Sequence, residues 1–200
     1  MHRHLRSVVA LVACAGAVAA QQVPEILYYK LNDGGGTLAL NEASPGAGFT
    51  QAVVNGAFTF GPGQLGGGLV GTGQTGANAY VDTGYTLNLQ GTSWTLEFWY
   101  TPTSYPSLQY LMGVPVGGSF RVYGAAQGGS ITLTGSGLGT VSATGAMPPI
   151  GTWVHIAYVF DATTTPPRVT PYVNGAPLAP VNQTGTLTLN TGAFRLGSQI

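Results

Sequence analysis

Short segments in which apolar and polar residues alternate follow one another from Gln21, separated by turns rich in Gly, Pro, Asn and Ser. Alternation with a period of two places successive side chains on opposite faces of a strand. The clearest examples are Trp94–Thr101 and Trp153–Phe160. In the first, one face carries Trp94, Leu96, Phe98 and Tyr100, and the other carries Thr95, Glu97 and Trp99. Because both segments have apolar residues on both faces, they are predicted to be central strands covered on both sides.

Many short strands with turn residues between them predict an all-β fold, specifically a two-sheet antiparallel β-sandwich. The predicted strands are Ile26–Leu31, Gly56–Thr59, Gly68–Gly71, Ala79–Asp82, Trp94–Thr101, Leu108–Val114, Ser119–Gly124, Ser130–Thr134, Thr140–Ala143, Trp153–Phe160, Val169–Val173, Pro177–Val181, Thr186–Leu189 and Ala193–Gly197. Asn174-Gly175 predicts a tight hairpin, because both central residues of such a turn need φ > 0. Pro171 and Pro177 cannot donate to a ladder, which places their strands at an edge or a bulge.

The first twenty residues have the pattern of an export signal. Arg3 and Arg6 precede the apolar, small-residue stretch Ser7–Ala20, which ends in an A-x-A sequence. Residues 1–20 are therefore predicted to be a signal peptide of bacterial type, and residues 21–200 a single secreted or cell-envelope domain. As an alternative, Leu11–Cys14 resembles a lipobox, in which Cys14 would carry a lipid anchor.

Charge is scarce, and this excludes two classes of partner. Charged residues make up 6% of the chain and sum to a formal net charge of zero. A nucleic-acid binder needs a basic stripe, and docking to anionic lipid needs a basic cluster. Five arginines and Lys30, scattered along the sequence, provide neither. The apolar stretch Ser7–Ala20 is also shorter than the roughly 20 residues that span a bilayer, so no transmembrane segment is expected.

Several motifs occur in the order found in laminin-G-like jelly-roll domains. They are Leu27–Thr37 (LYYKLNDGGGT), Gly63–Gly71 (GQLGGGLVG), Tyr80–Asp82 (YVD), Trp94–Trp99 (WTLEFW), Trp153–Ala157 (WVHIA), Tyr172–Gly175 (YVNG) and Phe194–Gly197 (FRLG). Over essentially all of residues 21–200, the chain resembles the laminin-G-like members of the concanavalin A-like lectin/glucanase superfamily, in the version found in exported bacterial proteins. The resemblance implies a jelly roll.

The resemblance also implies a further strand after Ile200, which pairs beside the first strand in this family. Two interpretations follow: the sequence is incomplete, or the jelly roll lacks its last strand. In the second case Ile26–Leu31 has an unpaired apolar edge, and such an edge favours self-association.

The sequence argues against an enzyme. Related hydrolases carry alternating acids on one strand, and glycoside hydrolysis ordinarily uses two carboxylates. Glu97 is the lone acid on the corresponding strand, where Phe98, Trp99 and Tyr100 follow it. His155 stands alone in mid-strand and is expected to be a hydrogen-bonded structural residue. No G-x-S-x-G element is present.

Recognition of a saccharide depends on aromatic surfaces with polar groups beside them. The candidate ligand-binding residues are Trp99, Glu97, Tyr110, Tyr123 and Trp153, with Tyr105 as a further aromatic side chain. Trp99 is the first choice, because it lies off the face that carries Leu96 and Phe98. The alternative for these aromatic side chains is a second core layer beneath a loop.

Calcium is the metal to consider, because exported jelly rolls often bind it and it prefers oxygen ligands. Asp33, Asp82 and Asp161 all follow predicted strands and are the candidate ligands of a structural Ca²⁺. The alternative is that these aspartates hydrogen-bond nearby turn amides.

These observations favour a non-enzymatic exported module that binds a glycan or an extracellular-matrix protein. Two alternatives remain open: a structural or adhesive envelope protein that acts through protein contacts, and a degenerate glycoside hydrolase.

Overall fold

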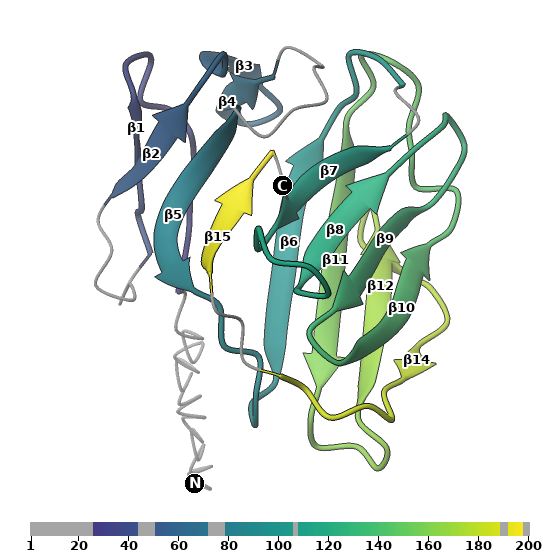
Figure 1. Cartoon of the computed structure of the whole chain (residues 1–200). Coiled ribbons are helices and arrows are strands. Elements are labelled where there is room, and N and C mark those ends of the chain that lie inside the picture. Colours follow the sequence, from purple (N-terminus) through teal and green to yellow (C-terminus); the bar gives the residue numbers. More distant parts are fainter. Residues whose placement is uncertain (1–25, 44–50, 72–78, 106–107, 189–191, 198–200) are drawn as a thin grey trace, which may run out of the picture.

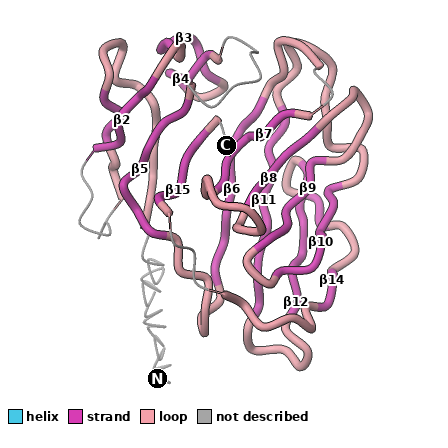
Figure 2. Tube along the Cα trace, viewed as in Figure 1, coloured by secondary structure: helices cyan, strands magenta, loops and turns pink. Residues whose placement is uncertain are grey.

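Two antiparallel sheets face each other in the computed structural model of this protein, as predicted (Figure 1). The structure describes residues 26–43, 51–71, 79–105, 108–188 and 192–197. Within these ranges it contains strands, turns and loops and no helix (Figure 2). The predicted signal peptide, with Cys14, lies outside the described residues.

The strands are short, and most of the long ones are those with the clearest alternation. They are β1 (Leu38–Leu40), β2 (Gln51–Asn55), β3 (Thr59–Gly63), β4 (Gly66–Val70), β5 (Tyr80–Thr86), β6 (Trp94–Tyr100), β7 (Gln109–Gly113), β8 (Arg121–Gly124), β9 (Ile131–Gly135), β10 (Leu138–Ala143), β11 (Val154–Asp161), β12 (Arg168–Val173), β13 (Ala176–Pro177), β14 (Val181–Asn182) and β15 (Ala193–Leu196).

The larger sheet has eight strands in the order β1-β2-β5-β15-β7-β8-β9-β10. The smaller sheet has the order β13-β12-β11-β6, and β14 also pairs with β12. β3 and β4 form a separate hairpin. The C-terminal strand β15 thus lies between β5 and β7, so segments distant in the sequence are joined within the larger sheet (Figure 1).

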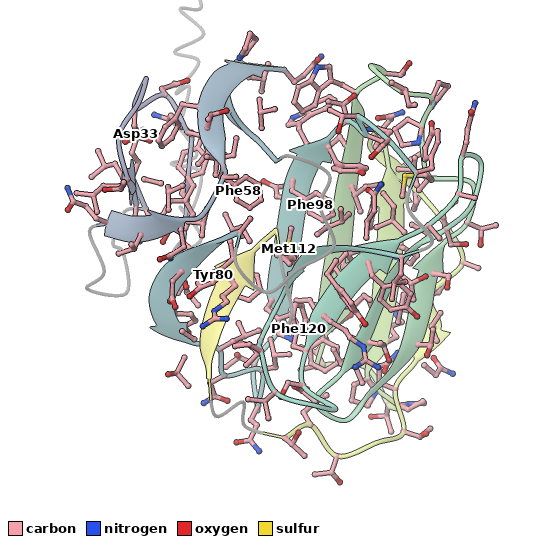
Figure 3. The ribbon with its side chains drawn as sticks, turned by 45° about the horizontal axis from the view of Figure 1, so that its top comes forward. Asp33, Phe58, Tyr80, Phe98, Met112 and Phe120 are labelled. Atoms are coloured by element: carbon pink, nitrogen blue, oxygen red, sulfur yellow. The ribbon has the colours of Figure 1, made fainter. Side chains whose placement is uncertain are left out.

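The main core fills the space between the two sheets. Val154, Ile156, Tyr158 and Phe160 of β11 are buried, and the intervening His155 and Val159 are partly exposed. Phe98 of β6 and Met112 and Phe120 from the larger sheet's side meet in this layer (Figure 3). Alternating side chains of facing sheets fill a layer about 10 Å thick, which is what makes a sandwich stable.

Tyr158 connects the two sheets by a hydrogen bond as well as by packing. Its ring is fully buried, and its hydroxyl donates to the carbonyl of Ile131 in β9 at 2.7 Å. Burial raises the pKa of this hydroxyl well above its usual range. The group therefore remains a neutral donor at any pH that the fold meets, so the bond between the sheets does not titrate.

A smaller core lies under the β1-β2-β5 end of the larger sheet. Ala39, Ala52, Val54 and Val81 are buried there, with Tyr29, Leu31, Phe58, Phe60 and Leu69 packed against them. The chain before β1 and the β3–β4 hairpin thus cover the part of the larger sheet that the smaller sheet does not reach.

The predicted first strand, Ile26–Leu31, is not a strand. Leu31 adopts φ 60°, which ends extended structure. The Tyr28 amide donates to the side chain of Asn41 at 2.8 Å, and the Asn41 amide group donates to the Ile26 carbonyl at 3.2 Å. The Glu42 amide also donates to the Tyr28 carbonyl at 2.8 Å. This segment is therefore bonded to residues 41–42, and Ile26–Leu31 does not form the open strand edge of the second interpretation above.

Four further expectations change. Gly56 begins a turn with φ 71°, so Gly56–Phe58 separates β2 from β3, and only Thr59 of the predicted strand Gly56–Thr59 is extended. Residues 186–188 are not extended into a sheet, because their backbone bonds the loops of the larger sheet, as in Thr188 to the Ser136 carbonyl at 2.9 Å. Pro177–Val181 breaks into the two short strands β13 and β14. β6 ends the smaller sheet and shows one face to solvent, whereas β11 is central as predicted.

The Asn174-Gly175 hairpin is confirmed, with φ of 50° and 79°, and Val173 pairs with Ala176 across it. Pro177 lies in the edge strand β13. Pro171 lies in β12, and its carbonyl accepts from Leu178 at 2.8 Å, on the side away from β11. The backbone nitrogen of Pro171, which has no hydrogen to donate, is therefore also on the side away from β11. On that side β12 pairs with β13 and then with β14, and Pro171 lies at the break between these two ladders.

Replacement of Tyr158 by Phe tests the bond between the sheets. We expect Tyr158→Phe to lower the free energy of unfolding by about 1–2 kcal/mol, because the Ile131 carbonyl loses a partner in a dry core. Urea unfolding measures it. Tyr172→Phe, on the outer face, is the matched control and should change stability by less than about 0.5 kcal/mol. Equal stability of Tyr158→Phe and the parent chain would contradict this role.

Candidate functional site

The outer face of the smaller sheet brings Trp99, Glu97 and His155 together. β6 and β11 are antiparallel, and the register sets Trp99 opposite His155 and Glu97 opposite Ala157. The Trp99 and His155 rings lie 5.1 Å apart at 47°. Trp99 is 41% exposed, so a large aromatic surface lies in water and does not contribute to a second core layer.

The imidazole of His155 lies close to both the Trp99 ring and a carboxylate, which come from the neighbouring strand β6. Its Nε2 lies 3.8 Å from Oε2 of Glu97, whose side chain is 65% exposed. The backbone amide of His155 donates to Oδ1 of Asn174 at 2.9 Å, and the Asn174 amide donates to the His155 carbonyl at 2.8 Å. The hairpin thus fixes the backbone beneath the ring.

The same face continues across β12. Tyr172 lies opposite Ala157, whose methyl group is the only side chain between Glu97 and Tyr172 along that row. We call Trp99, Glu97, His155, Ala157 and Tyr172 the Trp99 face. It combines two aromatic rings, an exposed carboxylate and an imidazole on the three neighbouring strands β6, β11 and β12.

Tyr110 and Tyr123 lie elsewhere. They face each other across β7 and β8 in the larger sheet, with their rings 6.0 Å apart in an edge-to-face arrangement. Tyr110 and Tyr123 lie on the outer face of the larger sheet, whereas the Trp99 face is the outer face of the smaller sheet. The full thickness of the sandwich therefore separates the two groups. The predicted ligand-binding residues therefore separate into two groups that cannot contact one small ligand together.

The remaining aromatic candidates are less exposed. Trp153 directly precedes β11 and is half-buried. Tyr105 donates its hydroxyl to the Pro148 carbonyl at 2.6 Å and packs against the main core. Tyr105 is thus a structural side chain.

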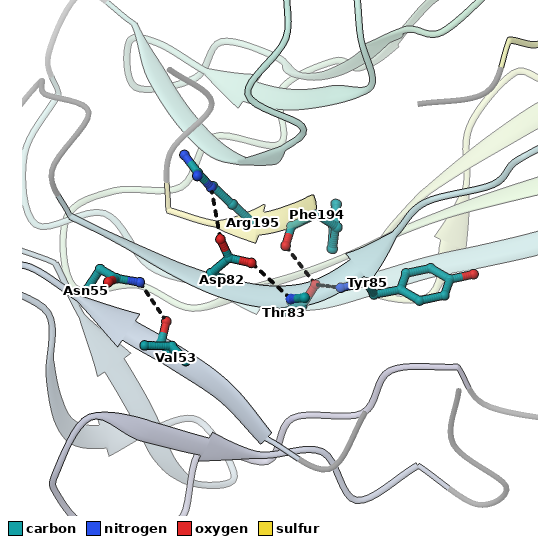
Figure 4. A network of polar contacts seen from close by, with 8 residues as sticks. Val53, Asn55, Asp82, Thr83, Tyr85, Phe194 and Arg195 are labelled. Carbon is teal, nitrogen blue, oxygen red and sulfur yellow. Dashed lines mark hydrogen bonds and ion pairs between the residues drawn. The ribbon is translucent and has the colours of Figure 1, made fainter. Parts of the chain in front are cut away.

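Asp82 takes part in an ion pair on the larger sheet. Its Oδ2 lies 3.5 Å from Nε of Arg195, and its Oδ1 accepts from the Gly84 amide at 2.9 Å (Figure 4). The Arg195 guanidinium lies 3.9 Å from the centre of the Tyr80 ring. Thr83 donates its hydroxyl to the Phe194 carbonyl at 2.7 Å, so β15 is joined to β5 by side chains as well as by its ladder.

The three aspartates considered for calcium do not form one site. Oδ1 of Asp33 accepts from the Leu40 amide at 3.1 Å, and Oδ1 of Asp161 accepts from the Thr163 amide at 2.9 Å. Across the described ranges, no three His, Cys, Asp or Glu side chains gather in a way that could hold a metal ion. Each carboxylate bonds groups close to it, and calcium binding stays a prediction.

A hollow of about 410 Å³ is lined by Gln90, Gly91, Phe160, Ala162, Pro167, Gln183, Gly185, Thr186 and Leu187. The amides that line it are already paired: Gln90 donates to the Leu187 carbonyl at 2.9 Å, and Oε1 of Gln183 accepts from Gly139 at 2.8 Å. This leaves little free hydrogen-bonding capacity, so the hollow is a weaker candidate than the Trp99 face.

Sequence reasoning missed the contact of His155 with Trp99 and Glu97, and it missed Tyr172. The signal was present in the alternation, which puts Trp99 and Glu97 on one face of β6 and His155 on one face of β11. The register between the two strands could not be predicted from the sequence, because neither segment specifies which of its residues faces which residue of the other strand.

Comparison with a protein-family model supports the fold. A family model described as Concanavalin A-like lectin/glucanases superfamily matches residues 75–199. A solved structure, the Ruminococcus gnavus IT-sialidase CBM40 bound to alpha2,3 sialyllactose, is similar with a TM-score of 0.42 and 19% identity. The similarity covers 52% of this chain and 62% of that chain, so less than two thirds of that structure is represented here. No curated protein matches.

The structure also bears on the titration of Asp161. Hydrogen bonds from the Thr163 hydroxyl, then from its amide, and the charge of Arg168 lower the pKa of this carboxyl. Because the folded pKa is lowered, the carboxylate stabilises the fold above the ordinary Asp pKa. That contribution is lost as pH falls through the lowered value.

We expect Thr163→Val to raise the pKa of Asp161 in an NMR titration. Thr164→Val, which spares the carboxylate bonds, should leave it unchanged, and an unaltered pKa in Thr163→Val would contradict the assignment.

Proposed function

Because the chain belongs to the concanavalin A-like lectin/glucanase superfamily, we propose that it is a carbohydrate-binding module that binds saccharides on the Trp99 face. One observation supports this most directly: Trp99 is 41% exposed on the outer face of the smaller sheet, with Glu97 and His155 beside it.

The chemistry of this face suits a neutral sugar ring. An indole exposes a broad apolar surface on which the apolar face of a pyranose can lie. The Glu97 carboxylate accepts hydrogen bonds from hydroxyl groups, and the imidazole can donate or accept. A ligand of this kind needs a few polar groups that fix its orientation around an apolar contact, and the Trp99 face has that composition.

We propose that the module binds without catalysing a reaction. Glycoside hydrolysis ordinarily needs two carboxyl groups about 5–9.5 Å apart. Besides Glu97 of β6, the acid on this face is Asp161 of β11. Glu97 lies opposite Ala157, and Asp161 is four residues beyond Ala157 in the same strand. At about 3.3 Å per residue the two positions are roughly 13 Å apart along the strand. Asp161 is also bonded to Thr163.

The site of action is part of the same proposal. The signal pattern in Met1–Ala20 favours export, so the ligand would be a glycan or a glycan-bearing matrix protein outside the cell. Within the described ranges, the structure has no helix of the length and apolarity that a membrane span requires.

A second candidate function is adhesion through protein contacts. β6 ends the smaller sheet, and Leu38 and Val53, which are neighbours across β1 and β2, are 43% and 47% exposed. A free edge and an apolar patch both favour protein association. Concentration-dependent oligomers without sugar binding would support this function over the first.

Replacement of Trp99 tests the proposal. A glycan array of neutral oligosaccharides identifies ligands, and calorimetry measures their affinity. We expect Trp99→Ala to weaken binding about tenfold or more, because loss of a stacked aromatic surface removes roughly 1.4 kcal/mol or more.

Leu65→Ala is the matched control: Leu65 is 76% exposed in the turn between β3 and β4, away from this face, and its loss should leave affinity unchanged. Equal affinities of Trp99→Ala and the parent chain, or no binding to any neutral glycan, would refute the Trp99 site.

A further inference from the structure

The outer face of the larger sheet carries a cation without an acid partner. The Lys and Arg side chains within the described ranges are Lys30, Arg121, Arg168 and Arg195. Lys30 pairs with Glu42 at 2.6 Å, Arg195 pairs with Asp82 at 3.5 Å, and Arg168 lies opposite Asp161. Arg121, in β8, is half-buried and makes no hydrogen bond or ion pair with any described residue. In a chain with 6% charged residues, an unpaired guanidinium that is partly withdrawn from water is an unusual feature.

Arg121 faces a second arginine across a position without a side chain. Gly113 of β7 pairs with Arg121 on one side and with Arg195 on the other. Neighbouring strands lie about 4.8 Å apart, so the two arginines start about 10 Å apart, with only backbone between them. A methyl group at Gly113 would lie 2.8 Å from the Phe120 carbonyl and 3.2 Å from Cβ of Arg121. Gly113 is buried and tightly packed, so glycine is required here and no side chain separates the two arginines.

The two arginines differ in how freely they can bind. Arg195 is held by Asp82 and lies over the Tyr80 ring, so its charge is largely balanced and its orientation is fixed. Its Nε is buried and lacks a hydrogen-bond partner within the described part of the chain. Arg121, by contrast, has no carboxylate partner among the described residues, so its positive charge is available to a ligand.

The neighbours of Arg121 are suited to an organic ligand. Tyr123 lies two residues along the same face of β8 and meets Tyr110 edge-to-face. Thr134 is opposite Arg121 in β9, and its hydroxyl lies 3.5 Å from that of Thr140. An inorganic ion would use the guanidinium alone. Rings and hydroxyl groups next to it match a sugar that carries an anion.

We propose that Arg121, Tyr123 and Thr134 form a second binding site, for a saccharide that bears an oxyanion, either a carboxylate or a sulfate. The guanidinium binds the oxyanion through two parallel hydrogen bonds, the Thr134 hydroxyl lies on the neighbouring strand, and Tyr123 contacts the sugar ring. This site lies on the other sheet from the Trp99 face and takes a different ligand, so it is independent of the function proposed above.

Calorimetry with three oligosaccharides of equal length tests the site: an oligomer of galacturonic acid, a sulfated galactose oligomer and a neutral galactose oligomer. We expect one or both acidic oligomers to bind, and to bind more weakly as salt is added. The carboxylated and sulfated arms show which oxyanion the site prefers. We expect Arg121→Gln to weaken acidic binding about tenfold or more, since a charge-assisted pair is lost.

Arg168→Gln removes the same charge from the smaller sheet and should leave acidic binding unchanged. Trp99→Ala should leave it unchanged as well, so failure of one site does not imply failure of the other. The proposal is overturned if neither acidic oligomer binds, if Arg121→Gln binds as the parent chain does, or if Arg168→Gln causes an equal loss.

Discussion

The packing of β11 against the larger sheet is the constraint on which the rest of this structure depends. Every second residue of β11 is committed to the layer between the sheets, and Tyr158 adds a buried hydrogen bond to β9. Because the period of a strand is two, burial of these residues forces His155 and its neighbours to the opposite face. The ladder to β6 then places Trp99 and Glu97 beside His155. The Trp99 face is a direct consequence of the core.

Prediction from the sequence was most successful where alternation was strong. The central place of β11, and which residues of β6 share a face, follow from the alternation alone. The apolar residues on both faces of β6 wrongly predicted a strand covered on both sides, because Trp99 is exposed. β1 and β2 were missed because their pattern is inverted: Ala39 is fully buried, whereas Leu38 and Leu40 are 43% and 44% exposed. The large residues of β1 point outward there, and the core beneath this end of the sheet is filled instead by Phe58, Phe60 and other large side chains from the chain before β1 and the β3–β4 segment.

The same reasoning explains which parts of the candidate site could be found. Glu97 and Trp99 are two apart in one strand, so local alternation unites them. Tyr110 and Tyr123 come from neighbouring strands, and their pairing depends on a register that no short segment encodes. That they lie on a different sheet from Trp99 depends on topology, in which β15 inserts between β5 and β7. The placement of Gly113 between Arg121 and Arg195 needs both pieces of information, because the two arginines are 74 residues apart in the sequence.

The scarcity of charge gives the remaining charged groups more weight. In a surface crowded with lysines and glutamates, an unpaired arginine would be one among many, screened and replaceable. Here Asp82 and Arg195 already balance each other between β5 and β15, so the potential near Gly113 is set chiefly by Arg121. The two outer faces are also chemically distinct: one offers an exposed indole with a carboxylate, the other a guanidinium with tyrosines. Since the buried layer separates them, the residues of either face can change without altering the other, provided that the inward positions of each strand keep their volume.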